Sequence, residues 1–148
     1  MEELRIRVAG ILPIDDGFAF MHRVGVQNHP IGDYYTFPGG GKEENETLEE
    51  GVKREIKEEL GINVEVLERL YEMQNPKERN KKEYFFLCKY ISGEFGSGTG
   101  PEFSENPEYK HRGKYIPEII KKEDVGKILL LPYEIRDKFI EDIKNGRF

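Results

Sequence analysis

The sequence predicts a single mixed α/β domain over residues 1–148. Three observations support this fold class. Several segments alternate in hydropathy or form short apolar runs, as strands do. Residues 48–60 carry apolar side chains at the spacing of a helix that faces a core, and residues 132–144 do so again near the end of the chain. Strands that enclose one early and one terminal helix are typical of a domain in which helices cover a sheet.

The N-terminal segment predicts a β-hairpin. Apolar residues alternate and then run together over residues 4–14, and a second apolar run covers residues 18–21. Asp15, Asp16 and Gly17 separate the two runs. An Asp-Gly pair between two such runs is typical of a tight turn that joins antiparallel strands.

A loop and a glycine-rich break are expected next. Residues 24–33 contain Gly, Asn, His and Pro without periodicity, which indicates a loop before the strand-like run at residues 34–37. Pro38 and the glycines at 39–41 are expected to interrupt regular structure. These glycines suit an ordinary tight turn, and they also suit a backbone that approaches a ligand closely.

The helix at residues 48–60 has clear signals at both ends. Thr47 and Glu50 form a capping box at its start, and Gly61 stands where a left-handed residue ends a helix. Its apolar stripe recurs every four residues and consists of Leu48, Val52, Ile56 and Leu60.

The second half of the chain is expected to form three strands and a helix. The corresponding segments are residues 64–74, 83–92, 114–120 and 132–144. The polar residues 77–82 predict a hairpin loop between the first two strands. Residues 93–113 form a loop of unusual length for a compact domain, which indicates a binding loop or a lid with glycines that allow movement.

Composition excludes several classes of protein. The chain has 23 basic and 29 acidic residues, a net charge of −6, and its bases are interleaved with acids, so nucleic-acid binding is not expected. The longest apolar runs are far shorter than the roughly 20 residues of a membrane helix. The start of the chain lacks the pattern of a secretory signal, and one cysteine makes no internal disulfide, so we expect a cytoplasmic protein.

Three acids lie together on the first predicted helix. Glu55, Glu58 and Glu59 are spaced i, i+3 and i+4, and Glu59 falls within the apolar stripe while Glu55 borders it. Like charges that face the protein repel one another, and burial increases the cost. Mg²⁺, which binds carboxylates together with substrate phosphates, would offset this repulsion.

The glycines and these acids belong to one longer pattern, G-x5-E-x7-R-E-U-x-E-E-x-G-U, in which U is a bulky aliphatic residue. The sequence matches it at Gly40, Glu46, Arg54, Glu55, Ile56, Glu58, Glu59, Gly61 and Ile62. The segment from Gly40 to Ile62 therefore resembles the Nudix hydrolase family, including its MutT-like members. The resemblance implies an α/β/α sandwich with a mixed β-sheet, and a nucleotide pyrophosphatase that acts on a nucleoside diphosphate linked to another group.

The resemblance also implies a metal site. Glu55, Glu58, Glu59 and the carbonyl of Gly39 would bind Mg²⁺, or Mn²⁺ in its place. The expected reaction is attack by water on a phosphorus atom of a diphosphate.

Further roles follow from the same resemblance. Arg54 and Glu46 would pair and orient the metal-binding carboxylates, with Arg54 also counted among the catalytic residues. Glu58 or Glu59 is expected to act as general base, and an acid of the long loop is a third candidate. In that loop Glu102 is the first choice and Glu105 the second.

Two residues outside the pattern are candidates for binding a small nucleotide substrate. Arg23 suits substrate phosphates, although a salt bridge at the end of a strand explains it equally well. Phe37 suits stacking on a base, although a place in the core is the commoner use of such a residue. Glu105 is a further candidate for binding the substrate. The protein is expected to be a monomer or a homodimer.

Other functions and several substrates stay open at this stage. A non-catalytic sensor of nucleotides or ADP-ribose would keep the fold, but such modules tend to lose the pattern's acids, all of which are present here. An isomerase of the isopentenyl diphosphate type would need a catalytic cysteine, whereas Cys88 lies in an apolar run. The substrate is open among ordinary nucleotides, oxidised nucleotides, ADP-sugars and dinucleoside polyphosphates.

Overall fold

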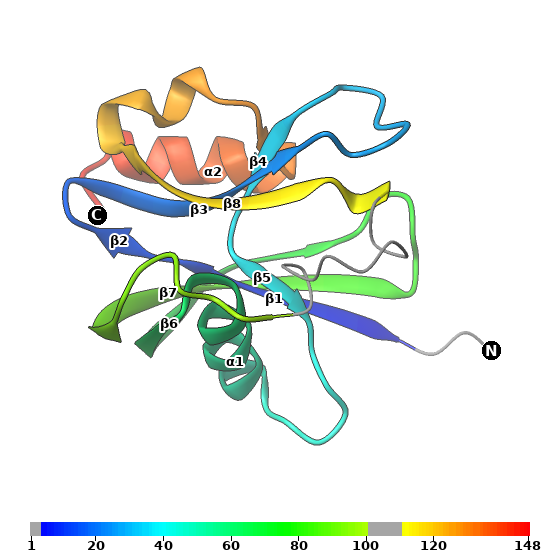
Figure 1. The fold of residues 1–148 in the computed structure, drawn as a ribbon, viewed down its shortest axis with the longest axis horizontal. Coiled ribbons are helices and arrows are strands. Elements are labelled where there is room, and N and C mark those ends of the chain that lie inside the picture. Colours follow the sequence, from blue (N-terminus) through cyan, green and yellow to red (C-terminus); the bar gives the residue numbers. More distant parts are fainter. Residues whose placement is uncertain (1–3, 101–110) are drawn as a thin grey trace.

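The computed structural model describes residues 4–100 and 111–148, which contain two α-helices and nine strands (Figure 1). In chain order the elements are β1 (Arg5–Ile11), β2 (Pro13–Ile14), β3 (Gly17–Val24), β4 (Tyr34–Thr36), β5 (Gly39–Gly41), α1 (Leu48–Leu60), β6 (Ile62–Gln74), β7 (Lys81–Gly93), β8 (Lys114–Lys121), the 3₁₀ helix η3 (Lys122–Lys127), β9 (Leu130–Leu131) and α2 (Tyr133–Lys144).

The strands form two mixed sheets. The first has the order β5-β1-β7-β6, in which β1 and β7 are parallel and the other pairs are antiparallel. The second is built around β3, which pairs with β2 and β4 along one edge and with β8 along the other, while β9 joins β4 in parallel. The α/β class with mixed β-structure is thus confirmed, and the strands divide between two sheets.

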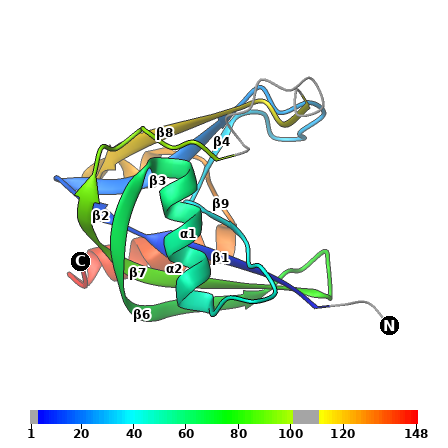
Figure 2. The ribbon, with the colours of Figure 1, turned by 60° about the horizontal axis from the view of Figure 1, so that its bottom comes forward.

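The two helices pack against opposite faces of the first sheet (Figure 2). Val8 of β1 and Phe86 of β7 share a buried cluster with the apolar stripe of α1. Their neighbours Ala9 and Phe85 point to the other face and share a second cluster with Phe139 of α2. This alternation follows from the two-residue period of a strand, and it gives α1 a rigid apolar support.

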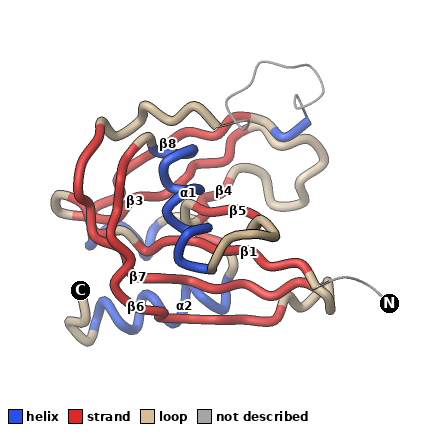
Figure 3. Tube along the Cα trace, turned by 90° about the horizontal axis from the view of Figure 1, so that it is seen from below, coloured by secondary structure: helices blue, strands red, loops and turns tan. Residues whose placement is uncertain are grey.

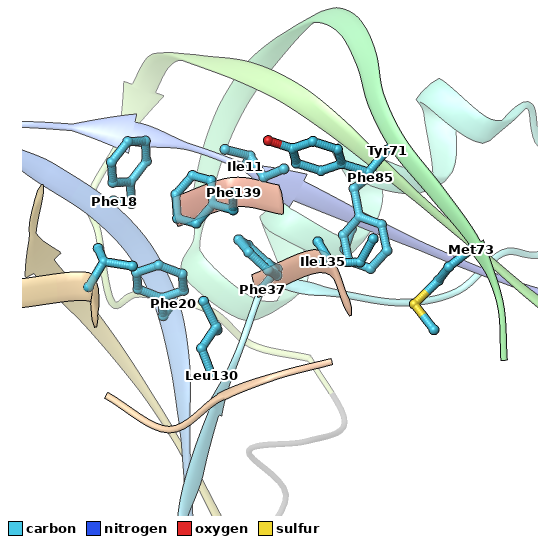
Figure 4. Packing of buried hydrophobic residues seen from close by; sticks show 12 residues of the cluster. Ile11, Phe18, Phe20, Phe37, Tyr71, Met73, Phe85, Leu130, Ile135 and Phe139 are labelled. Atoms are coloured by element: carbon cyan, nitrogen blue, oxygen red, sulfur yellow. The ribbon is translucent and has the colours of Figure 1, made fainter. Parts of the chain in front are cut away.

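Aromatic rings fill the cluster on the α2 side (Figure 4). Phe139 packs edge-to-face against Phe18 and Phe37, with ring centroids 4.8 and 5.3 Å apart. Met73 of β6 lies at the edge of this cluster, and Figure 4 shows it to one side of the aromatic rings. The core therefore ends near the start of β7, at the same end of the first sheet as β5.

Most expected elements are confirmed. β2 and β3 pair across the turn at Asp15 and Asp16, and α1 covers residues 48–60 as expected. The boundaries of β6, β7, β8 and α2 agree with the expected segments to within two residues.

Two short strands were not expected. Gly39–Gly41 forms β5, which pairs with β1 and places Gly40 opposite Val8, so the expectation of a complete break in regular structure is wrong. Leu130–Leu131 forms β9 through its pairing with β4. Elements of two or three residues exist through their partners, and the local sequence carries no pattern long enough to predict them.

Candidate active site

Helix α1 turns two carboxylates toward the interior. The side-chain oxygen of Thr47 accepts a hydrogen bond of 3.1 Å from the N–H of Glu50, whose carboxylate accepts one of 3.0 Å from the N–H of Thr47. Gly61 ends the helix at φ 77°. Between these caps, the apolar stripe sets the rotation of the helix, and Glu55 and Glu59 are buried with only 8% and 4% of their surface exposed.

The strand β5 lies directly against these carboxylates, and Figure 3 shows it beside α1. The N–H of Gly39 donates a hydrogen bond of 2.5 Å to Oε1 of Glu59. A β-carbon at Gly40 would lie 2.6 Å from the carboxylate of Glu55. A β-carbon at position 40 would therefore make the carboxylate of Glu55 move from this place.

Arg54 connects the other acids of the site. It makes a two-pronged contact with Glu46, with Nε 3.0 Å from Oε2 and Nη2 2.7 Å from Oε1. Its Nη1 lies 2.9 Å from Glu55 and 3.3 Å from Glu58, and its Nη2 donates to the carbonyl of Gly41 at 2.9 Å. The hydrogen bonds from Arg54 lower the pKa of Glu46, and those same bonds raise the pKa of Arg54.

The donor set suits a hard divalent cation. Three carboxylates supply the oxygen ligands that such cations prefer, and the absence of a β-carbon at Gly40 leaves access to Glu55. In the described part of the chain, no three acidic, histidine or cysteine side chains already stand at metal-binding spacing. Arg54 holds Glu55 and Glu58 instead. A cation would thus compete with Arg54 for these two carboxylates.

A pocket of about 410 Å³ opens beside this cluster. Glu55, Glu59 and the glycines of β5 line it, together with Arg23. The guanidinium of Arg23 lies 3.6 Å from the ring centre of Tyr115, and its Nη2 donates to the carbonyl of Arg112 at 2.7 Å. Within the described residues its Nε is buried without a hydrogen-bond partner. A positively charged donor therefore faces the same pocket as the carboxylates.

Phe37 belongs to the core. Its ring is 2% exposed and packs against Phe20, Phe85 and Phe139. Phe37 borders the pocket, but its ring is buried among other aromatic rings of the core cluster. The expectation that it stacks on a substrate base is therefore corrected.

The first part of the long loop is fixed to the end of α1. The N–H of Gly96 donates to the carbonyl of Leu60 at 2.9 Å, and that of Gly100 donates to the carbonyl of Glu58 at 3.0 Å. A β-carbon at Gly98 would lie 2.4 Å from two carbonyl oxygens of the last helical turn. Gly98 thus serves close packing on the helix end, while the expected movement of the long loop stays a prediction. Glu102 and Glu105 lie outside the described residues.

Cys88 lies away from the pocket, in the cluster beneath α1. It is 1% exposed, and burial raises its pKa to about 12. A thiol in this position is a small apolar core residue.

The sequence that forms this site lies within a region that matches a known family. A family model described as NUDIX domain matches residues 4–111. This range includes β5, α1 and the four glutamates of the site, which are Glu46, Glu55, Glu58 and Glu59. The chain belongs to the NUDIX family.

Two curated relatives resemble this NUDIX chain. It is 34% identical over 65 residues, or 43% of the chain, to the 8-oxo-dGTP diphosphatase of Proteus vulgaris. It is 32% identical over 104 residues, or 68% of the chain, to the ADP-ribose pyrophosphatase of Methanocaldococcus jannaschii. The matches span 57% and 59% of these relatives, so the chain covers less than two thirds of either.

Solved structures share the NUDIX fold of this chain. A NUDIX hydrolase from Nitrosomonas europaea superposes with a TM-score of 0.71 at 19% identity, covering 97% of this chain and 72% of that one. The MutT protein from Methanosarcina mazei Go1 superposes with a TM-score of 0.67 at 20% identity, covering 99% and 98%. At such identities the likeness concerns the fold. No helix in the described parts of the NUDIX chain is long and apolar enough to span a membrane.

Sequence reasoning missed several residues of the NUDIX pocket, including three polar residues that contact one another. Arg7, Asn75 and Glu83 all line it, and Glu83 is 6% exposed. Glu83 did carry a signal, because it occupies the same strand face as Phe85 and is acidic where the two-residue period calls for an apolar side chain. Arg7 and Asn75 carried no such signal in the sequence. Arg7 lies at the edge of an apolar pattern, and Asn75 lies in a polar turn.

Proposed function

We propose that this chain is a nucleotide pyrophosphohydrolase that depends on Mg²⁺, or on Mn²⁺ in its place, and cleaves a diphosphate bond in a nucleoside diphosphate linked to another group. The observation that carries the proposal is one pocket lined by Glu55, Glu59, the glycine strand β5 and Arg23. The names of the two curated relatives, a diphosphatase and a pyrophosphatase, describe the same class of chemistry and support it.

The cation would be held by Glu55, Glu58 and Glu59, with the carbonyl of Gly39 as a further ligand. When bound, Mg²⁺ neutralises phosphate oxygens and favours attack by water on phosphorus. The burial of Glu55 and Glu59 serves this role, because charges attract more strongly where water is excluded. The two-pronged contact of Arg54 with Glu46 would keep the guanidinium in place when its other carboxylates turn to the cation.

The reaction also needs a general base for the attacking water and a group that binds a substrate phosphate. Glu58 is the first candidate for the general base that takes a proton from the attacking water, since its side chain is 33% exposed and meets solvent. Glu59 and Glu102 are the other candidates, and Glu105 is proposed to meet the substrate. Arg23 would bind a phosphate, because Tyr115 holds its guanidinium at the pocket.

A hydrolysis screen tests the proposal. Purified protein is incubated with nucleoside triphosphates, nucleoside diphosphate sugars and dinucleoside polyphosphates, with Mg²⁺ or with EDTA, and the products are identified by mass. We expect cleavage with Mg²⁺ alone. The product masses identify both the substrate and the bond that is cut.

Two variants sharpen the screen. Glu58→Gln should lower kcat about 10²- to 10⁴-fold, the usual contribution of a general base. Glu49→Gln, an exposed residue of the same helix, should leave kcat unchanged and serves as the control. Absence of product from every nucleotide, together with nucleotide binding that ignores Mg²⁺, would overturn the proposal and identify a non-catalytic sensor.

A further inference from the structure

Glu83 is a buried acid that the proposed chemistry does not use. Among the described residues, the buried charged side chains are Glu55, Glu59 and Glu83. The first two belong to the proposed cation site. Glu83 lies on β7, in register with Arg7 of β1 on one side and Met73 of β6 on the other. This row follows the last apolar row of the α2-side core, so Glu83 stands where the core ends and the pocket begins.

Two neighbours hold the Glu83 carboxylate in place. Nε of Arg7 lies 3.6 Å from Oε1, and Nδ2 of Asn75 donates to Oε2 at 3.2 Å. The orientation of the Asn75 amide is set by its other end, since Oδ1 accepts the N–H groups of Lys77 and Glu78 at 2.9 and 3.1 Å. Oε1, Oε2 and Nδ2 therefore present two acceptors followed by a donor, held before any ligand arrives.

A second pocket meets the first at this point. Its volume is about 440 Å³, and it shares Asn75, Glu83, Leu131 and Pro132 with the pocket of the proposed cation site. Apolar side chains such as Ile31 and Met73 contribute to its walls. Apolar walls with a few placed polar groups are suited to a flat heteroaromatic ring. These three polar atoms, the polar triad, thus lie where the two pockets meet. The pocket of the proposed cation site suits the phosphates of a nucleotide, and the second pocket suits its base.

We propose that Glu83 and Asn75 read the edge of the substrate base and select a guanine-type base. Guanine presents two neighbouring N–H donors, at N2 and N1, followed by the O6 acceptor. The N2 and N1 donors would meet Oε1 and Oε2 of Glu83, and Nδ2 of Asn75 would donate to O6. This inference rests on the proposed function, and it names the substrate class of the same site.

The other common purine does not fit this triad. Adenine presents the N6 donor beside the N1 acceptor, so a ring nitrogen lone pair would face a carboxylate oxygen. A site built for hydrogen bonds rejects a ligand that leaves its buried polar groups unpaired. Selection at Glu83 therefore acts through mismatch as well as through attraction.

A binding series without divalent cation tests the inference apart from catalysis. GMP, IMP and AMP are titrated into wild-type protein in EDTA and followed by calorimetry. IMP keeps the N1 donor and O6 but lacks the N2 amino group, so it reports one hydrogen bond to the carboxylate. We expect IMP to bind about tenfold more weakly than GMP, and AMP more weakly still.

The variant Glu83→Gln links the preference to the carboxylate. It replaces one acceptor by a donor and should reduce the difference between GMP and IMP to less than about threefold. Glu72→Gln, an exposed residue on β6, should keep the wild-type preference. Equal binding of GMP, IMP and AMP by the wild type overturns the inference without any need for the variants. In that case Mg²⁺-dependent hydrolysis in the screen would still uphold the proposed function, whereas a GMP preference without hydrolysis would uphold base selection alone.

Discussion

The carboxylate of Glu55 lies directly against Gly40, so close that a β-carbon at position 40 would be 2.6 Å from it. The contact joins β5 to α1 and sets the position of one buried acid relative to the pocket. The hydrogen bond from the N–H of Gly39 to Glu59 acts in the same way on the second buried acid. The backbone of β5 thus contacts both buried acids of the proposed metal site, Glu55 and Glu59.

Gly40→Ala should displace Glu55. We expect the free energy of unfolding to fall by about 1–3 kcal/mol, as in overpacked interiors, and Mg²⁺-dependent hydrolysis to fall at least about tenfold. Urea denaturation and initial rates measure the two effects. Gly126→Ala, where a β-carbon meets nothing within 4 Å, is the matched control and should change neither quantity by much. Wild-type rates in Gly40→Ala would contradict the role of this contact.

The pair of Glu46 and Arg54 predicts a pH-dependent contribution to stability. Hydrogen bonds from Arg54 lower the pKa of Glu46 in the folded protein, so the folded state favours the ionised form more than the unfolded chain does. This stabilisation is complete above the unfolded pKa of about 4.3 and is lost as pH falls through the lower folded pKa. Urea denaturation without divalent cation should show Glu46→Gln less stable than the wild type at pH 7, with the difference shrinking below about pH 4. A difference that stays constant with pH would show that Arg54 contributes nothing to the titration of Glu46.

Gly98→Ala tests the attachment of residues 94–100 to α1. Its β-carbon would lie 2.4 Å from two carbonyl oxygens of the helix end, so the loop has to move away. We expect a loss of about 1–3 kcal/mol in the free energy of unfolding and faster amide hydrogen exchange at Gly96 and Gly100, whose N–H groups bond to the helix. Thr99→Ala, at an exposed neighbour, is the control. Unchanged exchange in Gly98→Ala would show that the loop is held by other contacts.

Cys88 should behave as an inert core residue. Because burial raises its pKa to about 12, almost no thiolate forms at neutral pH, and a thiol reagent should label the native protein far more slowly than the protein in urea. Cys88→Ala should cost about 1 kcal/mol of stability and leave hydrolysis unchanged. Fast labelling of the native protein, or loss of hydrolysis in Cys88→Ala, would instead indicate a reactive cysteine.

Local signals in the sequence were enough to predict α1 and the inward position of two of its acids. The capping box at Thr47 and the left-handed Gly61 limit the helix, and the four-residue stripe sets which side is buried. Because helix geometry is regular, the positions of Glu55 and Glu59 relative to the stripe followed from spacing alone, and both are buried in the structure. The resemblance to the Nudix pattern rested on the same segment.

The tertiary structure decided what surrounds that helix. β5 is too short to be predicted and exists through its pairing with β1, yet its glycines position both buried acids. Phe37 suited either stacking on a base or a place in the core, and the structure packs its ring in the core. Gly98 lies in the loop that was expected to move, and the structure packs it against the end of α1.

The sequence by itself thus determined the α/β class, the acidic helix and the family resemblance, because these depend on residues close together along the chain. Only the tertiary structure brought Glu83 and Asn75 to the pocket of Glu55 and Glu59. That juxtaposition arises from the parallel pairing of β1 with β7 and from the β6–β7 hairpin. Such contacts depend on the register between distant strands, which no local periodicity specifies.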